Sequence, residues 1–181
     1  MATFFQLGVK FTMLEIRTIT QKEILNHTQF LELCTKKKCK VYAWNLYTSK
    51  DSVEDYITTL LTNHIFNYQF IGAFDGEELV GIISLKLLLS SGEQHKAYLE
   101  NLATKTTSTI EEEIIATSLF DHIIELCNSK HIEILLTSVA SNNISAKIFF
   151  SQHNFEMLAF EPNARKLDSN YIDEHWLSYH L

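Results

Sequence analysis

The sequence predicts a single α/β domain whose central sheet mixes antiparallel and parallel strands. An Asp75-Gly76 turn signal separates two runs rich in β-forming residues, which is the pattern of an antiparallel hairpin. Farther along, an apolar helical pattern lies between two apolar strand patterns, and a strand-helix-strand unit of this kind places its strands parallel. With 181 residues, 46% of them apolar, the chain can bury the core of one such domain.

The first elements are a strand and two helices. From Met13 onward, residues 14–20 alternate apolar and polar side chains, as a half-buried strand does. Two helical patterns follow, and Ser52 with Asp55 marks the start of the second. Their apolar positions are Ile24, Phe30, Leu31 and Leu33, then Val53, Tyr56, Ile57, Leu60 and Leu61. We interpret residues 1–12 as an N-terminal extension and residues 13–181 as one domain.

An aromatic-rich segment, residues 41–47, separates the two predicted helices. Its aromatic side chains favour core packing, and the wall of a substrate site is the alternative. Both interpretations stay open for Tyr42, Trp44 and Tyr47.

The remaining elements follow from period and turn signals. We expect hairpin strands at residues 70–74 and 79–85, a strand at 97–104, a helix burying Ile115, Leu119, Ile123 and Leu126, a strand at 132–139, a short helix at 143–153, and final strands near 155–160 and 176–181. Pro162 is expected in the loop before the last strand.

Composition excludes several classes of function. A net charge of -7 and a pI near 5.6 argue against nucleic-acid binding. Three cysteines without paired spacing predict neither a disulfide framework nor a zinc site, and they favour a reducing cytoplasm. Eight scattered histidines form no metal-binding motif. No apolar run approaches the roughly 20 residues of a membrane span, and no signal peptide is evident, so we expect a cytoplasmic protein without a membrane partner.

Three local patterns point to a known family. The block from Asn143 to Glu156 has an Asn, an Ala three residues later, an aromatic pair and a closing Asn-Phe. Residues 99–104 (Leu-Glu-Asn-Leu-Ala-Thr) form a strand, and Ile115-Ala116 precedes Leu119-Phe120 on a helix. Together with the order of elements, these patterns resemble the GNAT (GCN5-related) N-acetyltransferases over residues 13–181.

The resemblance implies a fold and a reaction. It implies a mixed sheet of about seven strands with helices on both faces, whose fourth and fifth strands splay apart. It also implies acetyl-CoA, or another acyl-CoA, as co-substrate, no metal, and direct acyl transfer to the amine of a small molecule or a protein. The family's pantetheine arm enters the splay like an extra strand.

By this resemblance, seven residues would contact the cofactor. Main-chain groups of Leu102, Ala103 and Thr104 would bond the arm, and the Asn143 amide would lie beside it. Asn143 is equally suited to cap the following helix. The remaining three expected contacts are Thr109, Ala146 and Phe150.

The pyrophosphate loop departs from the family pattern. The family pattern has an Arg or Gln and then glycines at the start of the central helix, but the chain has Ser108-Thr109-Ile110 followed by Glu111 to Glu113. Either Ser108 with Glu111 or Thr109 with Glu112 has the spacing of a helix cap. Carboxylates there would repel a diphosphate, whereas nearby hydroxyls and Lys105 can still attract one.

Glu100 is the candidate general base, because the family often places a carboxylate on this strand. The alternative is a strand carboxylate that faces solvent. Phe150 stands where the family often has a Tyr that protonates the CoA thiolate, and it has no proton to give. A catalytically impaired GNAT-fold binding or regulatory module is therefore the alternative function. An exposed final strand would allow pairing in a homodimer.

Overall fold

The computed structural model describes residues 14–36, 39–43, 53–62, 66–90, 92–105, 108–167 and 169–181. The expected extension at residues 1–12 lies outside these. Strands form one eight-stranded sheet in the order β1-β3-β4-β5-β6-β8-β7, and β2 pairs with β5 off this path. Their bounds are β1 (Leu14–Ile19), β2 (Lys40–Val41), β3 (Phe66–Asp75), β4 (Glu78–Leu88), β5 (Lys96–Thr104), β6 (Ile134–Ala140), β7 (Glu156–Leu167) and β8 (Asn170–His180).

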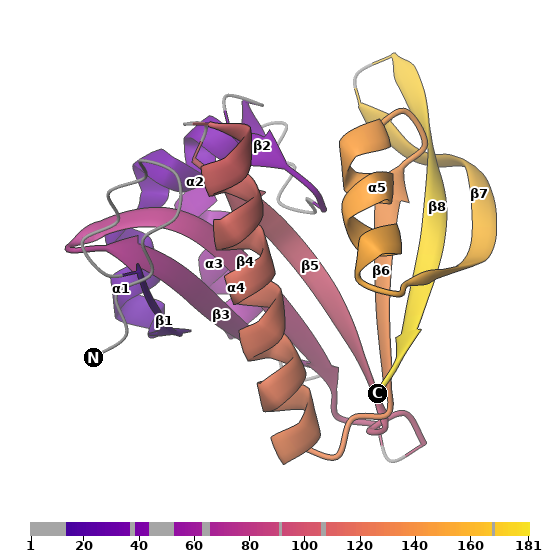
Figure 1. Ribbon diagram of the computed structural model, residues 1–181, viewed down its shortest axis with the longest axis horizontal. Helices are drawn as coiled ribbons and strands as arrows, with labels where there is room; N and C mark the ends of the chain where they lie inside the picture. Colours follow the sequence, from indigo (N-terminus) through magenta and orange to yellow (C-terminus); the bar gives the residue numbers. More distant parts are fainter. Residues whose placement is uncertain are drawn as a thin grey trace.

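Helices cover both faces of the sheet (Figure 1). They are α1 (Gln21–Asn26), α2 (Thr28–Thr35), α3 (Val53–Leu61), α4 (Thr109–Ser129) and α5 (Ile144–Gln152). One apolar cluster packs α4 and α5 on one face, and a second cluster packs α1, α2 and α3 on the other. The predicted fold class is confirmed, and β2 accounts for one strand beyond the seven expected.

The central hairpin and the strand-helix-strand unit form as predicted. Asp75 pairs with Glu78 across the turn, where Gly76 has a φ of +62°. A φ of this sign favours glycine and is common in tight hairpin turns. Strands β5 and β6 pair in parallel, with α4 between them in the chain.

The first predicted helix is divided at His27. Thr20 caps α1 through a reciprocal capping box with Glu23, and α2 begins one residue after His27. Within α2, the helical period puts Phe30, Leu31 and Cys34 on the buried face, whereas Leu33 lies off this face and is 42% exposed. The prediction that Leu33 belongs to the core was wrong for this reason.

The C-terminal strands are longer than predicted and form a hairpin. Pro162 lies inside β7, where the pairing register with β8 shifts, and not in a loop. An edge strand tolerates proline because one side of its backbone needs no ladder partner. Since β8 lies between β6 and β7, the final strand is not the sheet edge that we expected to serve dimer pairing.

Gly81 of β4 lets α4 lie close to the sheet. A Cβ atom at this position would be 2.4 Å from Ile115 Cγ2 and 3.0 Å from Leu119 Cδ1. We therefore expect Gly81→Ala to lower the free energy of unfolding by about 1–3 kcal/mol, measured by urea denaturation, because the overpacked helix must shift. Gly92→Ala is the matched control, since its Cβ would meet no atom within 4 Å. Equal unfolding midpoints for the two variants would contradict this packing.

Candidate active site

Strands β5 and β6 part in the middle of the sheet. Their parallel pairing covers only Lys96 to Tyr98 of β5 and Ile134 to Leu136 of β6. Beyond Tyr98 the strands diverge, leaving a gap that is visible between them in Figure 1. We call this the β5–β6 opening; it corresponds to the splay that the family resemblance implied.

A β-bulge in β5 lies at the start of the opening. Pairing with β4 shifts register between Glu100 and Ala103, and Asn101 has a φ of 56°. Ser84 of β4 secures the bulge, because its hydroxyl donates to the main-chain oxygen of Glu100 at 3.0 Å and accepts from Asn101 Nδ2 at 2.8 Å. The bulge redirects the strand and fixes Glu100 beside the opening.

The Glu100 carboxylate is buried. Its side chain is 11% exposed, so the alternative of a solvent-facing carboxylate was wrong. The Tyr68 hydroxyl donates a hydrogen bond to Oε2, and Lys86 Nζ lies 4.0 Å from Oε1. Cross-strand pairing places Tyr68, Lys86, Tyr98 and Glu100 on the face that carries α1, α2 and α3. Tyr68 and Lys86 therefore join Glu100 in the candidate site, although no residue pattern in the sequence marks them.

Aromatic rings surround the Lys86 ammonium group. Its Nζ lies 4.6 Å from the ring centre of Phe66, 5.4 Å from that of Tyr98 and 6.0 Å from that of Tyr68. Contacts of this kind attract a cation through the negative faces of the rings. The ammonium group is thus held near Glu100 by the sheet itself.

Residues 39–43, which we call the β2 strap, lie along β5 on the side of the opening. Lys40 pairs with Thr104 and Val41 with Ala103, while β4 occupies the other edge of β5 at the same residues. The amides of Tyr42 and Ala43 both donate to Leu102 O, at 2.9 and 3.3 Å. Main-chain groups expected to hold the pantetheine arm are therefore bonded to the strap.

Asn143 joins the strap to α5. Its Oδ1 caps the helix by accepting from the Ala146 amide at 3.1 Å, which confirms the capping role. Its Nδ2 donates to Val41 O at 2.9 Å. Both polar ends of this amide thus bind protein groups, and the cofactor contact remains a prediction.

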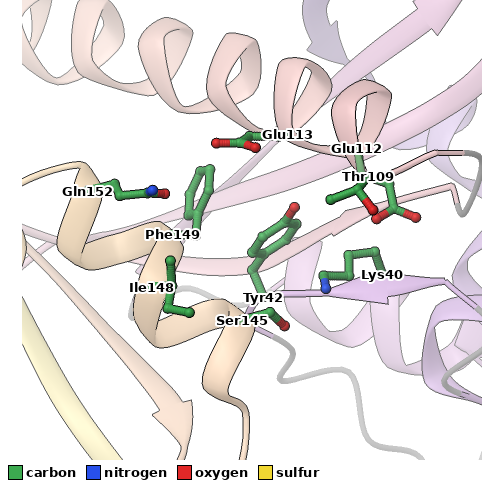
Figure 2. Close-up of a pocket in the computed structure, with 9 residues that line it drawn as sticks. All are labelled: Lys40, Tyr42, Thr109, Glu112, Glu113, Ser145, Ile148, Phe149 and Gln152. Atoms are coloured by element: carbon green, nitrogen blue, oxygen red, sulfur yellow. The ribbon is translucent and has the colours of Figure 1, made fainter.

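An open cleft lies between the start of α4 and α5, on the face opposite Glu100. Figure 2 shows its lining, with the α4 carboxylates on one side, the α5 residues on the other and Tyr42 between them. The lining residues are Lys40, Tyr42, Thr109, Glu112, Glu113, Ser145, Ile148, Phe149 and Gln152. Of the expected cofactor residues, Thr109 lines this cleft.

The cleft is acidic at the helix start. Ser108 caps α4 by accepting from the Glu111 amide at 3.3 Å, so the first of the two capping alternatives is confirmed. Glu112 is only 7% exposed, although it carries a carboxylate. Burial raises the pKa of Tyr42 to about 12, and the charges of Glu112 and Glu113 add to the shift. The phenol therefore stays protonated at neutral pH.

Tyr42 packs in the core and also lines the cleft, so the packing role is confirmed and its role as a substrate wall stays a prediction. It is 5% exposed and its ring packs against Phe149 at 4.7 Å between centres, on the α4 and α5 side of the sheet. The other two expected wall residues, Trp44 and Tyr47, lie outside the described residues.

Two expected cofactor residues of α5 are buried in the core. Ala146 and Phe150 have no exposed surface, and Phe150 packs against Phe149 and Phe155. Phe150 thus supports the helix from the core side. The structure gives it no polar role in proton transfer.

Buried hydroxyl groups border the opening on its α4 side. Thr104 of β5 and Thr137 of β6 each have a fully buried side-chain oxygen that finds no hydrogen-bond partner within the described residues. Buried polar atoms normally have partners. Hydroxyls in this position fit a ligand with amide groups, such as a pantetheine arm.

Among the residues with described positions, no three His, Cys, Asp or Glu side chains are arranged to hold a metal ion. No described helix has the length and apolar character that crossing a membrane requires.

Solved structures similar to this chain include several acetyltransferases. A probable acetyltransferase from Staphylococcus epidermidis ATCC 12228 is 34% identical, with a TM-score of 0.75 over 93% of this chain and 99% of that chain. An N-acetyltransferase from Staphylococcus aureus Mu50 is 27% identical, with a TM-score of 0.72 over 93% of this chain and 97% of that chain. A putative acetyltransferase from Salmonella typhimurium, solved with its cofactor acetyl-CoA, is 12% identical and shares the fold at a TM-score of 0.71 over 93% and 94%.

The family follows from the sequence. The sequence model of the family described as acetyltransferase (GNAT) domain matches residues 16–176 of this chain. The chain therefore belongs to the GNAT acetyltransferase family, as the resemblance predicted. No curated protein matches it.

Proposed function

We propose that this protein is an N-acyltransferase that moves an acetyl or related acyl group from acyl-CoA directly to an amine. The observation that carries the proposal is the buried Glu100 carboxylate, held by Tyr68 where β5 leaves β6. A base for this reaction must be fixed within hydrogen-bond reach of the acceptor, and a buried, oriented carboxylate satisfies that need. Reduced thiols at Cys34, Cys39 and Cys127 suit a cytoplasmic enzyme.

The two substrates would meet in the β5–β6 opening from opposite faces. Acyl-CoA would approach from the α4 cleft, and the amine from the Glu100 face. Glu100 would take a proton from the ammonium group, directly or through water. The amine nitrogen would then attack the thioester carbonyl carbon, and the C–S bond would break as the new C–N bond forms.

The departing thiolate also needs a proton, and Phe150 cannot supply one. Water or the product ammonium group can. Tyr42 is the protonated phenol of the cleft, and in Figure 2 its hydroxyl points toward the first turn of α4.

Binding of the arm along β5 requires the β2 strap to move. The strap is joined to β5 through Lys40, Val41, Tyr42 and Ala43, and these bonds use the main-chain groups that the arm would need. An arm that replaces the strap exchanges one set of strand-like hydrogen bonds for another, as added strands commonly do. Strap displacement is therefore part of the proposed binding step.

Hydrogen exchange can detect this displacement. We expect the amides of Tyr42 and Ala43 to exchange faster when acetyl-CoA saturates the protein, because they lose Leu102 O as acceptor. The hairpin of β3 and β4 provides the internal control and should not change. Slower or unchanged exchange in residues 39–43 would show that the strap stays on β5.

A non-catalytic binding or regulatory module is the second candidate function. Glu112 and Glu113 beside the cleft favour it, because carboxylates repel the diphosphate of CoA. Under this alternative the strap would fill the opening permanently. The two candidates differ in whether acyl-CoA binds and reacts.

Calorimetry with acetyl-CoA and CoA, followed by a CoA-release assay over a panel of amines, tests the proposal. We expect binding in the micromolar to millimolar range, weakened by the acidic cleft, and CoA release that depends on an amine. No heat of binding at millimolar ligand would rule out the enzyme. Binding without amine-dependent release would favour the second candidate.

A further inference from the structure

Lys86 is the cation that an acceptor meets beside the proposed base. Its Nζ lies 4.0 Å from Glu100 Oε1, and its side chain is 25% exposed compared with 11% for Glu100. A direct charge-assisted hydrogen bond would be about 2.7–2.9 Å long, so the ammonium group does not close on this carboxylate. The ammonium group therefore keeps N–H donors that can bind a negative group beside Glu100.

The position of Lys86 is fixed by its neighbours. Tyr68 and Tyr98 lie opposite it on β3 and β5, and Phe66 gives the shortest ring contact at 4.6 Å. A lysine side chain in open solvent samples many conformations, whereas this one is held by three rings. A preorganised charge of this kind recognises a ligand with little loss of conformational entropy.

The charge sets a requirement for the acceptor. An ammonium group that approaches Glu100 Oε1 comes close to a second ammonium group, and the two repel each other. An acceptor with a negative group beside its amine removes this conflict, because the negative group pairs with Lys86 while the amine pairs with Glu100.

We propose that Lys86 determines acceptor specificity and that the acceptor is a small free α-amino acid, with its amine on Glu100 and its carboxylate on Lys86. This inference rests on the proposed function and adds the substrate class. The spacing supports it: in an α-amino acid the nitrogen and the nearer carboxylate oxygen are about 3 Å apart. That separation is about 1 Å shorter than the 4.0 Å between Glu100 Oε1 and Lys86 Nζ, so the ligand amine can contact Glu100 while the ligand carboxylate contacts Lys86.

Matched ligand pairs test the proposal. Each common α-amino acid is compared with its α-amino amide, which keeps the side chain and amine but lacks the carboxylate charge. We measure binding by saturation-transfer NMR and turnover by CoA release. For the preferred side chain, the acid should exceed the amide about ten- to hundredfold in kcat/KM, the effect of a hydrogen bond between charged groups.

Substitutions at Lys86 give a second readout. Lys86→Met should raise KM for the acid by about tenfold or more and lower KM for the amide, whose ammonium group no longer meets a second positive charge, so the preference disappears. Lys86→Arg should keep the preference because it keeps the charge. Lys130→Met is the matched control, since Lys130 is exposed at the end of α4. A purely structural role would affect acid and amide alike.

Three results would overturn the proposal: amides binding as well as acids, no α-amino acid binding at millimolar concentration, or an unchanged preference in a folded Lys86→Met variant. The first would indicate a peptide N-terminus, which has no carboxylate beside its amine. The acid and amide comparison on the wild-type protein decides the matter even where a variant fails to fold. If acetyl-CoA still binds and other amines are acetylated, the proposed function stands while this inference fails.

Discussion

Glu100→Gln is expected to lower kcat by about 10²- to 10⁴-fold, the usual contribution of a positioned general base. The glutamine amide keeps the size of the side chain and can still accept from the Tyr68 hydroxyl, so the bulge in β5 should remain. What is lost is the ability to take the proton of the acceptor. We therefore expect the affinity for acetyl-CoA, measured by calorimetry, to stay at the wild-type value.

Glu156→Gln is the matched control, because Glu156 is an exposed strand carboxylate on β7, away from the opening. It should keep wild-type kinetics. A Glu100→Gln enzyme that works at the wild-type rate would remove Glu100 as the base. A variant that loses acetyl-CoA binding as well would indicate a structural role for the carboxylate.

Removing the two carboxylates of the cleft should tighten CoA binding. Like charges about 4 Å apart at an effective dielectric near 20 repel by roughly 4 kcal/mol, and screening by salt reduces this. We expect the Glu112→Gln, Glu113→Gln double variant to bind CoA at least about tenfold more tightly in calorimetry at low salt. The gain should shrink as salt is added.

Glu125→Gln serves as the control for this change, because Glu125 is exposed on the same helix but farther along it. It removes a charge of the same sign outside the cleft. An affinity for CoA that is the same in the double variant and the control would show that Glu112 and Glu113 do not repel the diphosphate.

Local sequence signals predicted most of the fold. The Asp75-Gly76 pair predicted the hairpin, because few residues adopt the positive φ angles that a two-residue turn needs. The long apolar face of α4 and the capping residues Ser108 and Asn143 were likewise readable, since helix periodicity and caps depend on neighbours three or four residues away. The family patterns then placed Glu100 beside the opening.

Register was harder to predict. A bulge between Ala73 and Phe74 shifts the pairing of β3 and β4 by one residue and sets Tyr68 opposite Lys86. Without the shift, Lys86 would point to the other face of the sheet. The position of Lys86 among these rings therefore depends on a β-bulge that cannot be predicted from residue patterns.

The β2 strap was also beyond prediction from local patterns. Lys40–Val41 is only two residues long, and it pairs with residues of β5 that are more than sixty positions away in the chain. Nothing in so short a segment specifies a strand. The strap forms because Leu102, Asn143 and Phe149 offer it partners in the folded domain.

A crystal structure with acetyl-CoA bound tests most directly whether this chain uses its β5–β6 opening for acyl transfer. We expect the arm to lie along Leu102 to Thr104, the strap to have left β5, and the thioester to reach the opening beside Glu100. The strap still bonded to Leu102, with acetyl-CoA bound elsewhere or not at all, would contradict the proposed binding step and the function built on it.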